Sequence, residues 1–236
     1  MQTKDLQKLG ITKASSVLLI YPHPDDETFA NAGLIQELSE AGVKFKVMVL
    51  TKGEASTLYF GRYKGVLSDV REKEFDSVMQ FLGVPSYEIL GYKDKHLENE
   101  LNLGDFLTQE VREFKATHIV TYEPCGIYGH PDHVYLSELL TSISKYTQTS
   151  LVYSTVPRSY KIPQAGLAMA KNPKLIKPLT PTVILPLSVK QYFKKLKAIT
   201  LYESQYSNKS SLISGIEHLV LFTKEYYHCS VLTKEL

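Results

Sequence analysis

The chain has 236 residues, of which 43% are hydrophobic and 22% are charged, and its formal net charge is +2. This is an ordinary globular composition, and the length suits a single α/β domain with a large core. So small a positive surplus gives no argument for a nucleic-acid partner, and no apolar run approaches the ~20 residues that span a bilayer. The two cysteines, Cys125 and Cys229, form no CxxC motif. Without an apolar signal core near the start, we expect a cytoplasmic protein with no membrane anchor.

Strand and helix patterns alternate along the chain. Apolar runs predict buried parallel strands at residues 16–21, 45–50, 87–90, 118–122 and 151–155. Apolar residues at helical spacing predict helices over about 28–41, 70–82, 103–114, 131–145 and 189–202. Gly42 and Gly83 stand where the first two should end. The alternation predicts an α/β fold, namely a Rossmann-like, doubly wound and mostly parallel sheet with helices on both faces.

The region 157–186 breaks this rhythm because it holds six prolines and few long apolar stripes. We interpret it as an irregular, Pro-rich excursion near the sheet edge that serves either as a lid or as an oligomer contact. Beyond it, we expect a late strand over residues 217–223. The whole chain, residues 1–236, is expected to form one domain.

The densest group of polar side chains follows the first predicted strand. Residues 21–27 read YPHPDDE, with a histidine, two aspartates and a glutamate within five positions. In open α/β folds, the loops after the strands carry the sites. One interpretation is a helix cap, in which Asp26 and Glu27 complement the helix dipole. Capping requires neither the histidine nor the proline, and a bound cation would offset the repulsion between neighbouring carboxylates, so we favour a site.

A second polar loop follows the strand at residues 118–122. Residues 118–133 read HIVTYEPCGIYGHPDH and again contain His-Pro-Asp, with His133 three positions after His130. Loops after parallel strands share one edge of a sheet, so the two clusters can converge. Two histidines and a carboxylate form the three-ligand set of a catalytic zinc, which leaves a fourth position for water. A neighbouring carboxylate can then accept the proton of that water.

These two clusters belong to a longer series of motifs. In chain order the series is PHPDDETFANAG, TKGE at the end of a strand, REKEFDSVMQFLGV, LGYKD, GIYGHPDH and AITLYESQ. In order and spacing it resembles the LmbE-like, or PIG-L-like, zinc-dependent N-deacetylases, and GIYGHPDH is most similar to the mycothiol-type members. The resemblance covers about residues 15–205.

The resemblance implies roles for the residues of both clusters. It implies that His23, Asp26 and His133 bind one zinc ion per chain. It also implies that Asp25 is the general base and that His130 stabilises the oxyanion or acts as an acid.

It extends to residues outside the two histidine motifs. Tyr128 matches a mobile tyrosine implicated in catalysis in some members. Arg71 and Asp94 match positions that hold the sugar, and we place Glu54, the last residue of TKGE, with them in substrate binding. The family usually carries a histidine where this chain has Tyr202, and this departure leaves the substrate open.

Two further carboxylates are expected to support the centre. We expect Glu27 to orient the ring of His23, in preference to acting only as a helix cap. We expect Asp132 to raise the pKa of His130, so that a charged imidazolium can donate a proton.

Together these features imply a hydrolase that removes an acetyl group from an N-acetylglucosamine-type or related N-acyl amino-sugar conjugate, releasing acetate and a free amine. The alternatives are a metal-dependent phosphoesterase, which often uses two harder ions, and a non-catalytic metal- or sugar-binding protein. The expected partner is a small-molecule amino sugar, with no nucleic acid. Because family members often form trimers or hexamers, a homo-oligomer is also expected.

Overall fold

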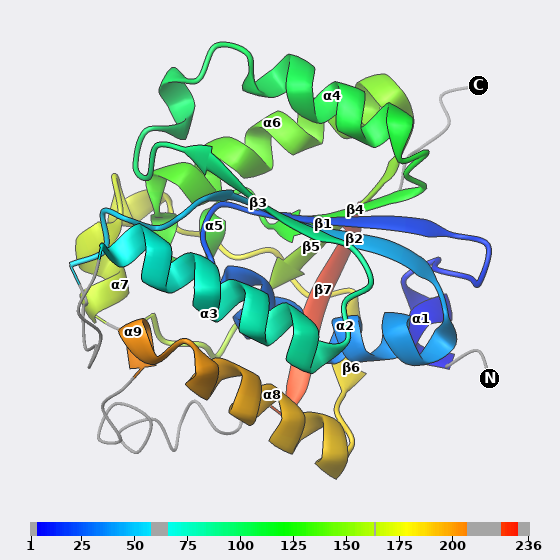
Figure 1. The fold of residues 1–236 in the computed structure, drawn as a ribbon. Helices are drawn as coiled ribbons and strands as arrows, with labels where there is room; N and C mark the ends of the chain where they lie inside the picture. Colours follow the sequence, from blue (N-terminus) through cyan, green and yellow to red (C-terminus); the bar gives the residue numbers. More distant parts are fainter. Residues whose placement is uncertain (1–3, 58–65, 163, 207–222, 231–236) are drawn as a thin grey trace.

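The computed structural model describes residues 4–57, 66–162, 164–206 and 223–230 of the chain. The strands are β1 (Ser16–Tyr21), β2 (Lys44–Thr51), β3 (Tyr87–Tyr92), β4 (His118–Tyr122), β5 (Ser150–Thr155), β6 (Val183–Pro186) and β7 (Lys224–Ser230). They form one seven-stranded sheet in the order β3-β2-β1-β4-β5-β7-β6 (Figure 1). Strands β1 to β5 pair in parallel, whereas β7 runs antiparallel to both of its neighbours, β5 and β6.

Helices cover both faces of this sheet. They are α1 (Lys4–Lys8), α2 (Asp26–Ala41), α3 (Leu67–Leu82), α4 (Leu103–Glu113), α5 (Gly126–Gly129), α6 (Pro131–Thr147), α7 (Gln164–Met169), α8 (Val189–Leu201) and α9 (Glu203–Tyr206), with short 3₁₀ turns η1 (Leu97–Asn99) and η2 (Pro173–Leu175). Figure 1 shows α4 and α6 over one face, and α2, α3 and α8 over the other. The predicted fold class is confirmed. Among the described residues, none of the helices has the length and apolar character that crossing a membrane requires.

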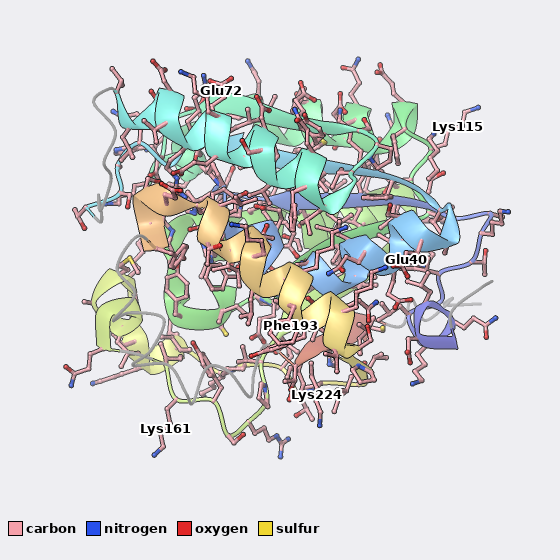
Figure 2. All side chains as sticks on the ribbon, turned by 60° about the horizontal axis from the view of Figure 1, so that its bottom comes forward. Glu40, Glu72, Lys115, Lys161, Phe193 and Lys224 are labelled. Atoms are coloured by element: carbon pink, nitrogen blue, oxygen red, sulfur yellow. The ribbon has the colours of Figure 1, made fainter. Side chains whose placement is uncertain are left out.

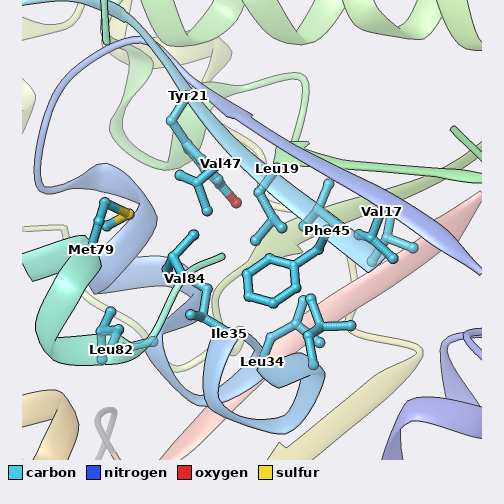
Figure 3. Close-up of a cluster of buried hydrophobic side chains, with 14 of the residues drawn as sticks. Val17, Leu19, Tyr21, Leu34, Ile35, Phe45, Val47, Met79, Leu82 and Val84 are labelled. Carbon is cyan, nitrogen blue, oxygen red and sulfur yellow. The ribbon is translucent and has the colours of Figure 1, made fainter. Parts of the chain in front are cut away.

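The core consists of two apolar layers, one on each side of the sheet. Successive side chains of a strand point to opposite faces, so a strand that is buried on both faces contributes to both layers. On β1, Val17 and Leu19 belong to the cluster with α2 and α3, whereas Leu18 and Ile20 belong to the cluster with α4 and α6. Figure 3 shows the first cluster, in which the ring of Phe45 lies among side chains of the sheet and α2. This two-sided burial explains why the parallel strands read as continuous apolar runs.

Local sequence signals located most elements closely. Each of the five parallel strands lies within two residues of its predicted ends, and α2 and α3 end at Gly42 and Gly83, both with positive φ (64° and 79°). The late strand expected over 217–223 stays a prediction. Most of its predicted range, 217–222, lies outside the described residues, and β7 begins after it, at Lys224.

The Pro-rich region 157–186 is more regular than expected, because it contains α7, η2 and the edge strand β6. Along β6, Val183 and Leu185 are buried while Ile184 and Pro186 are exposed. A four-residue strand with a proline carries too short a pattern to be recognised, and such strands are typical of sheet edges. The role of this region as a lid or an oligomer contact stays a prediction.

One buried carboxylate ties this region to the sheet. Glu123 follows β4 directly, is fully buried, and accepts a hydrogen bond from the backbone N–H of Leu179. The hydroxyl of Thr155 donates to the carbonyl of Leu179 at 3.0 Å. Burial raises the pKa of Glu123 from its usual 4.5 to about 7.

A buried ion pair holds β7 against the helices below the sheet. Helix α2 is kinked at Asn31 (φ −138°, ψ 16°), and the Glu225 carboxylate accepts the N–H groups of Gly33 and Leu34 at 2.7 and 2.9 Å. The same carboxylate pairs with Lys195 of α8 at 2.7 Å, and both side chains are almost fully buried. The contact fixes α8 relative to α2, and so places the α8–α9 corner beside the end of β1.

The Glu123 contact predicts a pH dependence of stability. Because the folded-state pKa of this carboxyl is raised, its contribution to stability is complete below pH 4.5 and is lost as the pH rises through about 7. Glu123→Gln removes this titration, so its free energy of unfolding relative to wild type should increase between pH 5 and pH 8. Urea unfolding at both values measures this. The matched control is Glu40→Gln, since Glu40 projects from α2 into solvent (Figure 2). A difference for Glu123→Gln that does not change with pH would contradict the prediction.

Candidate metal centre and active site

The two predicted clusters meet at the carboxyl edge of the sheet. Strands β1 and β4 are neighbours in the sheet, and the strand order switches direction between them. In open α/β sheets this switch point is where sites form. The ring centroid of His23, after β1, lies 4.8 Å from that of His130 and 5.3 Å from that of His133, both after β4. All three histidines are buried.

Three predicted ligand atoms form a nearly equilateral triangle. Asp26 Oδ2 lies 3.2 Å from His23 Nδ1 and 3.4 Å from His133 Nε2, and the two nitrogens are 3.3 Å apart. A tetrahedral ion with bonds of ~2.0–2.1 Å requires ligand atoms roughly 3.3–3.4 Å from one another. The donor set and its spacing therefore fit a tetrahedral metal ion.

The three histidines together form an alternative ligand set, because their ring nitrogens lie within 4.8 Å of one another. His130, however, is the N-cap of α6, and its Nδ1 accepts the backbone N–H of Asp132 at 3.3 Å. A neutral imidazole that accepts at Nδ1 carries its proton on Nε2, so Nε2 is a donor and not a ligand. This favours Asp26 over His130 as the third ligand.

The far side of the His23 ring faces two carboxylates. Its Nε2 lies 3.0 Å from Asp94 Oδ1 and 3.3 Å from Asp132 Oδ2. Burial by itself would lower the pKa of His23, but hydrogen bonds with Asp132, Asp26 and Asp94 raise it well above its usual value. A metal-bound histidine commonly donates its second N–H to a carboxylate, which fixes the ring and its tautomer. The geometry gives this supporting place to Asp94 and Asp132.

Asp132 raises the pKa of His130, as the sequence predicts, but it does not outweigh the burial of the ring. The Asp132 carboxylate contacts His23 and accepts the backbone N–H groups of Lys95 and Leu97 at 2.7 and 3.2 Å. Burial lowers the pKa of His130 to about 3, and the neighbouring histidines act in the same direction. The lowered pKa and the accepting Nδ1 both favour a neutral ring whose available group is an Nε2–H donor.

The sequence predicts that Glu27 orients the ring of His23, but the hydrogen bonds of its carboxylate are to Asp25, Thr28 and Tyr202. Its Oε2 accepts the backbone N–H of Asp25 at 3.0 Å, and its Oε1 accepts the hydroxyls of Thr28 at 2.6 Å and Tyr202 at 2.5 Å. One of these partners, Tyr202, lies 175 positions away in the sequence. The place of Glu27 in the motif therefore did not indicate its role. Glu27 supports Asp25.

Asp25 lies beside the triangle and outside it. Its backbone has φ 105°, a conformation that residues with a side chain rarely adopt. The Tyr206 hydroxyl donates to its Oδ2 at 3.2 Å, and Arg71 Nη2 lies 3.5 Å from its Oδ1. Burial raises the pKa of Asp25 to about 7, and the positive charge of Arg71 opposes that rise.

The residues expected to bind the substrate hold the loop after β2. Arg71 is 3% exposed and donates to the carbonyls of Gly53 and Pro24. Glu54 Oε1 accepts the backbone N–H of Asp94 at 2.9 Å. These contacts build the wall of the site, and binding of a sugar by Arg71, Asp94 and Glu54 stays a prediction.

Tyr128 lies on a sharply turned loop beside His133, one of the candidate metal ligands. Its hydroxyl lies 3.5 Å from His133 Nε2, and Ile127 before it has a positive φ of 64°. A Cβ at Gly126 would come within 2.6 Å of the Cβ of His133, so only glycine lets this loop approach α6. Burial raises the pKa of Tyr128 well above its usual value, which keeps its hydroxyl protonated as a donor.

Two tyrosines of the site were not recognised in the sequence. Tyr122 donates to Asp26 Oδ1 at 3.1 Å, and its ring stacks on His133 with centroids 4.7 Å apart. Tyr206 contacts Asp25, as described above. The only available signals were that Tyr122 is the last residue of a strand leading into the second motif and that Tyr206 is one helical turn after Tyr202.

Comparison with known proteins identifies the family. A family model described as PIG-L, GlcNAc-PI de-N-acetylase, matches residues 18–144. The chain belongs to this family, which confirms the resemblance seen in the sequence. Membership also confirms the expected class of enzyme, an N-deacetylase that hydrolyses an amide bond.

Individual relatives are more distant. A Bacillus anthracis protein named "Probable N-acetyl-alpha-D-glucosaminyl L-malate deacetylase 2" is 29% identical over 204 residues, covering 82% of each chain. The 1D-myo-inositol 2-acetamido-2-deoxy-alpha-D-glucopyranoside deacetylase 2 of Catenulispora acidiphila is 28% identical over 144 residues, covering 50% of this chain and 47% of its own length. This chain thus spans about half the length of that second relative.

Solved structures share the fold at low sequence identity. The N,N'-diacetylchitobiose deacetylase from Pyrococcus horikoshii has a TM-score of 0.69 at 22% identity, covering 96% of this chain and 90% of that one. GalB, a 4-carboxy-2-hydroxymuconate hydratase from Pseudomonas putida, has a TM-score of 0.62 at 16% identity, covering 94% and 99%. A hydratase therefore shares this fold, and the fold by itself does not decide the reaction.

The triangle makes a prediction about metal binding. His133→Ala removes one of its corners, and affinity for a divalent metal should fall more than the ~10–100-fold typical of losing an outer-shell partner. Elemental analysis after dialysis against a zinc buffer measures this. The control is His118→Gln, a buried histidine at the opposite end of β4, which should retain the wild-type metal content. Equal metal content in the two variants would exclude His133 as a ligand.

Proposed function

We propose that this protein is a zinc-dependent N-deacetylase that acts on an N-acetylglucosamine-type or related N-acyl amino-sugar conjugate and releases acetate and a free amine. One observation carries the proposal: the His23–Asp26–His133 triangle has the separations of a tetrahedral ligand set, and a second carboxylate, Asp25, lies beside it. The amino-sugar substrate is supported by the relatives, whose names specify glucosaminyl malate and inositol glucosaminide conjugates.

Zinc suits a set of two imidazoles and one carboxylate, held by His23, His133 and Asp26 with one ion per chain. When bound there, zinc would supply a Lewis acid and lower the pKa of a water molecule to ~7. The solved structure of a teicoplanin deacetylase is described as a zinc-inhibited form. Metal identity and metal excess are therefore variables in the assay of this protein.

In this mechanism Asp25 carries a proton from the attacking water to the amide nitrogen. Its two carboxylate oxygens are held by Tyr206 and Arg71, and its raised pKa, about 7, allows it to accept and return a proton near neutral pH. Asp25 takes a proton from the attacking water as the new C–O bond forms. It then gives that proton to the amide nitrogen as the C–N bond breaks, so that the amine leaves neutral.

His130 and Tyr128 are the donors for the carbonyl oxygen. His130 is neutral, with its proton on Nε2, and Tyr128 keeps its hydroxyl proton. Both can strengthen hydrogen bonds to that oxygen as negative charge develops on it. This role needs no imidazolium, and it replaces the acid role that the sequence suggested for His130.

A two-metal phosphoesterase is less well supported. Its second metal would lie among His23, Asp94 and Asp132. His23 would then have to bind a metal at each ring nitrogen, although a neutral imidazole has only one lone pair available. Asp132 is also already occupied by two backbone N–H groups. A non-catalytic binding protein would need neither the positioned Asp25 nor the donor at His130. Homo-oligomerisation, as a trimer or hexamer, and a cytoplasmic location remain predictions.

Asp25→Asn tests the function directly. The variant should retain bound zinc and lose roughly 10²–10⁴-fold in kcat, because an amide cannot accept the proton. Amine release is followed on N-acetylglucosaminides of malate and myo-inositol and on diacetylchitobiose, with and without chelator. Asp105→Asn, on the exposed face of α4, is the control. Wild-type activity in Asp25→Asn would contradict the assignment of Asp25 as the base. Activity that resists the chelator would contradict the requirement for a metal.

Substitutions of His130 test whether its side chain acts as a neutral hydrogen-bond donor or as an acid. His130→Ala should lower kcat by roughly 10²–10³-fold, the usual cost of losing one donor to a developing oxyanion. His130→Gln retains an N–H donor, so it should recover at least about tenfold of that loss. The kcat values of both variants at pH 7.5 measure the difference. If glutamine is as poor as alanine, the imidazole has a role that a neutral donor does not explain.

A further inference from the structure

We propose that Tyr202 and Tyr206 are positioning residues that hold Asp25 in its working geometry, one through the backbone and the other through the carboxylate. The two tyrosines are four positions apart at the corner between α8 and α9, about 180 residues from Asp25. The inference rests on the proposed function, in which Asp25 is the base. The experiment below keeps a readout that is independent of that function.

The backbone of Asp25 needs an external restraint. A φ of 105° is strained at a residue with a Cβ and persists only where the surroundings impose it. The turn matters because it directs adjacent carboxylates to different places. Asp26 faces the two histidines, and Asp25 faces Arg71 and Tyr206.

Glu27 supplies the restraint on the backbone. Its Oε2 accepts the N–H of Asp25 at 3.0 Å, within the turn itself. Glu27 is fully buried, so its carboxylate has no water to hold it and depends on protein donors. The restraint is therefore only as firm as the other hydrogen bonds that hold Glu27.

Tyr202 is the distant donor that fixes Glu27. Its hydroxyl donates to Glu27 Oε1 at 2.5 Å, and its side chain is fully buried. Tyr202 itself is held at the end of α8, a helix that begins with a capping box at Ser188 and is tied to β7 through Lys195. The chain of contacts thus runs from a rigid helix through Tyr202 and Glu27 to the amide of Asp25.

Tyr206 acts on the carboxylate itself. Its backbone N–H donates to the carbonyl of Tyr202 at 3.0 Å, which places it one turn farther along. Its hydroxyl donates to Asp25 Oδ2 at 3.2 Å while Arg71 faces Oδ1, and its ring lies 4.9 Å from that of Phe29. With a donor at each oxygen, the carboxylate keeps one orientation.

The experiment compares Tyr202→Phe, Tyr206→Phe and Tyr153→Phe. Tyr153 is the matched control, because its buried hydroxyl also makes one hydrogen bond, to Thr141 at 2.6 Å, but on the opposite face of the sheet. Three quantities are measured. The first is the residue-resolved amide hydrogen exchange rate in the metal-free protein, and the other two are kcat and KM for amine release by the zinc-loaded protein.

The two tyrosines should give different signatures. In Tyr202→Phe the amide of Asp25 should exchange at least about tenfold faster, since a hydrogen bond to a charged group is lost. In Tyr206→Phe that amide should exchange as in wild type. Both variants should lose roughly 10–100-fold in kcat, as outer-shell partners do, with KM changed by less than about twofold. Tyr153→Phe should match wild type in all three quantities.

Each of the following outcomes would contradict one half of the proposal or the proposed function. If Tyr202→Phe leaves the Asp25 amide protected, Glu27 does not depend on Tyr202 and that half of the proposal fails. If Tyr206→Phe keeps the kcat of Tyr153→Phe while Asp25→Asn is inactive, the other half fails. If wild type releases no amine from any substrate, the proposed function fails, and the exchange measurement still decides whether Tyr202 holds the turn. Should Tyr202→Phe not fold, Glu27→Gln tests the same chain of contacts one step closer to Asp25. Unchanged exchange of the Asp25 amide in Glu27→Gln would show that Glu27 does not hold the turn, and the proposal for Tyr202 would fail with it.

Discussion

A carboxylate taken out of water must be matched by a cation or by hydrogen-bond donors, and this requirement organises the centre of the molecule. Glu27 and Asp132 meet it with protein groups, since both accept backbone N–H groups and are held by neighbouring side chains. Asp26 differs. One of its oxygens lies 3.2 and 3.4 Å from ring nitrogens of His23 and His133, which is the spacing that a shared tetrahedral metal ion requires. Asp26 also accepts the backbone N–H of His23 at 3.0 Å and the hydroxyl of Tyr122 at 3.1 Å, so all three acids have protein donors. What distinguishes Asp26 is the oxygen that faces two histidine nitrogens at the spacing of metal ligands.

This arrangement depends on one backbone turn. Asp25 and Asp26 are adjacent, yet they face different partners, because the positive φ of Asp25 rotates its side chain away from His23 and His133. A metal ligand and a base need opposite environments. The ligand must stay ionised, whereas the base must exchange a proton near neutral pH. In the proposed function, consecutive residues of a short motif provide both, provided that the rest of the fold holds the strained turn.

The antiparallel edge of the sheet contributes to that support. Strand β7 and helix α8 are joined by the buried Lys195–Glu225 pair, and the same carboxylate caps the kink of α2. The α8–α9 corner is thereby fixed beside the loop after β1. Strand β7 and helix α8 follow an irregular region in the sequence, yet they help to hold Asp25 in position. The loop after β4 is braced separately, because α7 and η2 pack against α5.

Much of the fold and of the grouping of the candidate ligands could be predicted from the sequence, for a physical reason. Parallel strands buried on both faces read as apolar runs, and parallel topology brings the loops after β1 and β4 to one edge, so His23, Asp26 and His133 could be associated across 110 positions. Other features depend on distances and burial that no local pattern encodes. The partner of Glu27 is a tyrosine 175 positions away, and the neutral state of His130 follows from its desolvation and its place at the N-cap of α6. Strand β6 was too short for its period to be read. The sequence by itself determined the fold class, the family and the candidate ligands, because these follow from periodicity and motif order. Only the tertiary structure decided the protonation of His130, the support of Asp25 and the place of Tyr206, because each is set by long-range contacts in a buried environment.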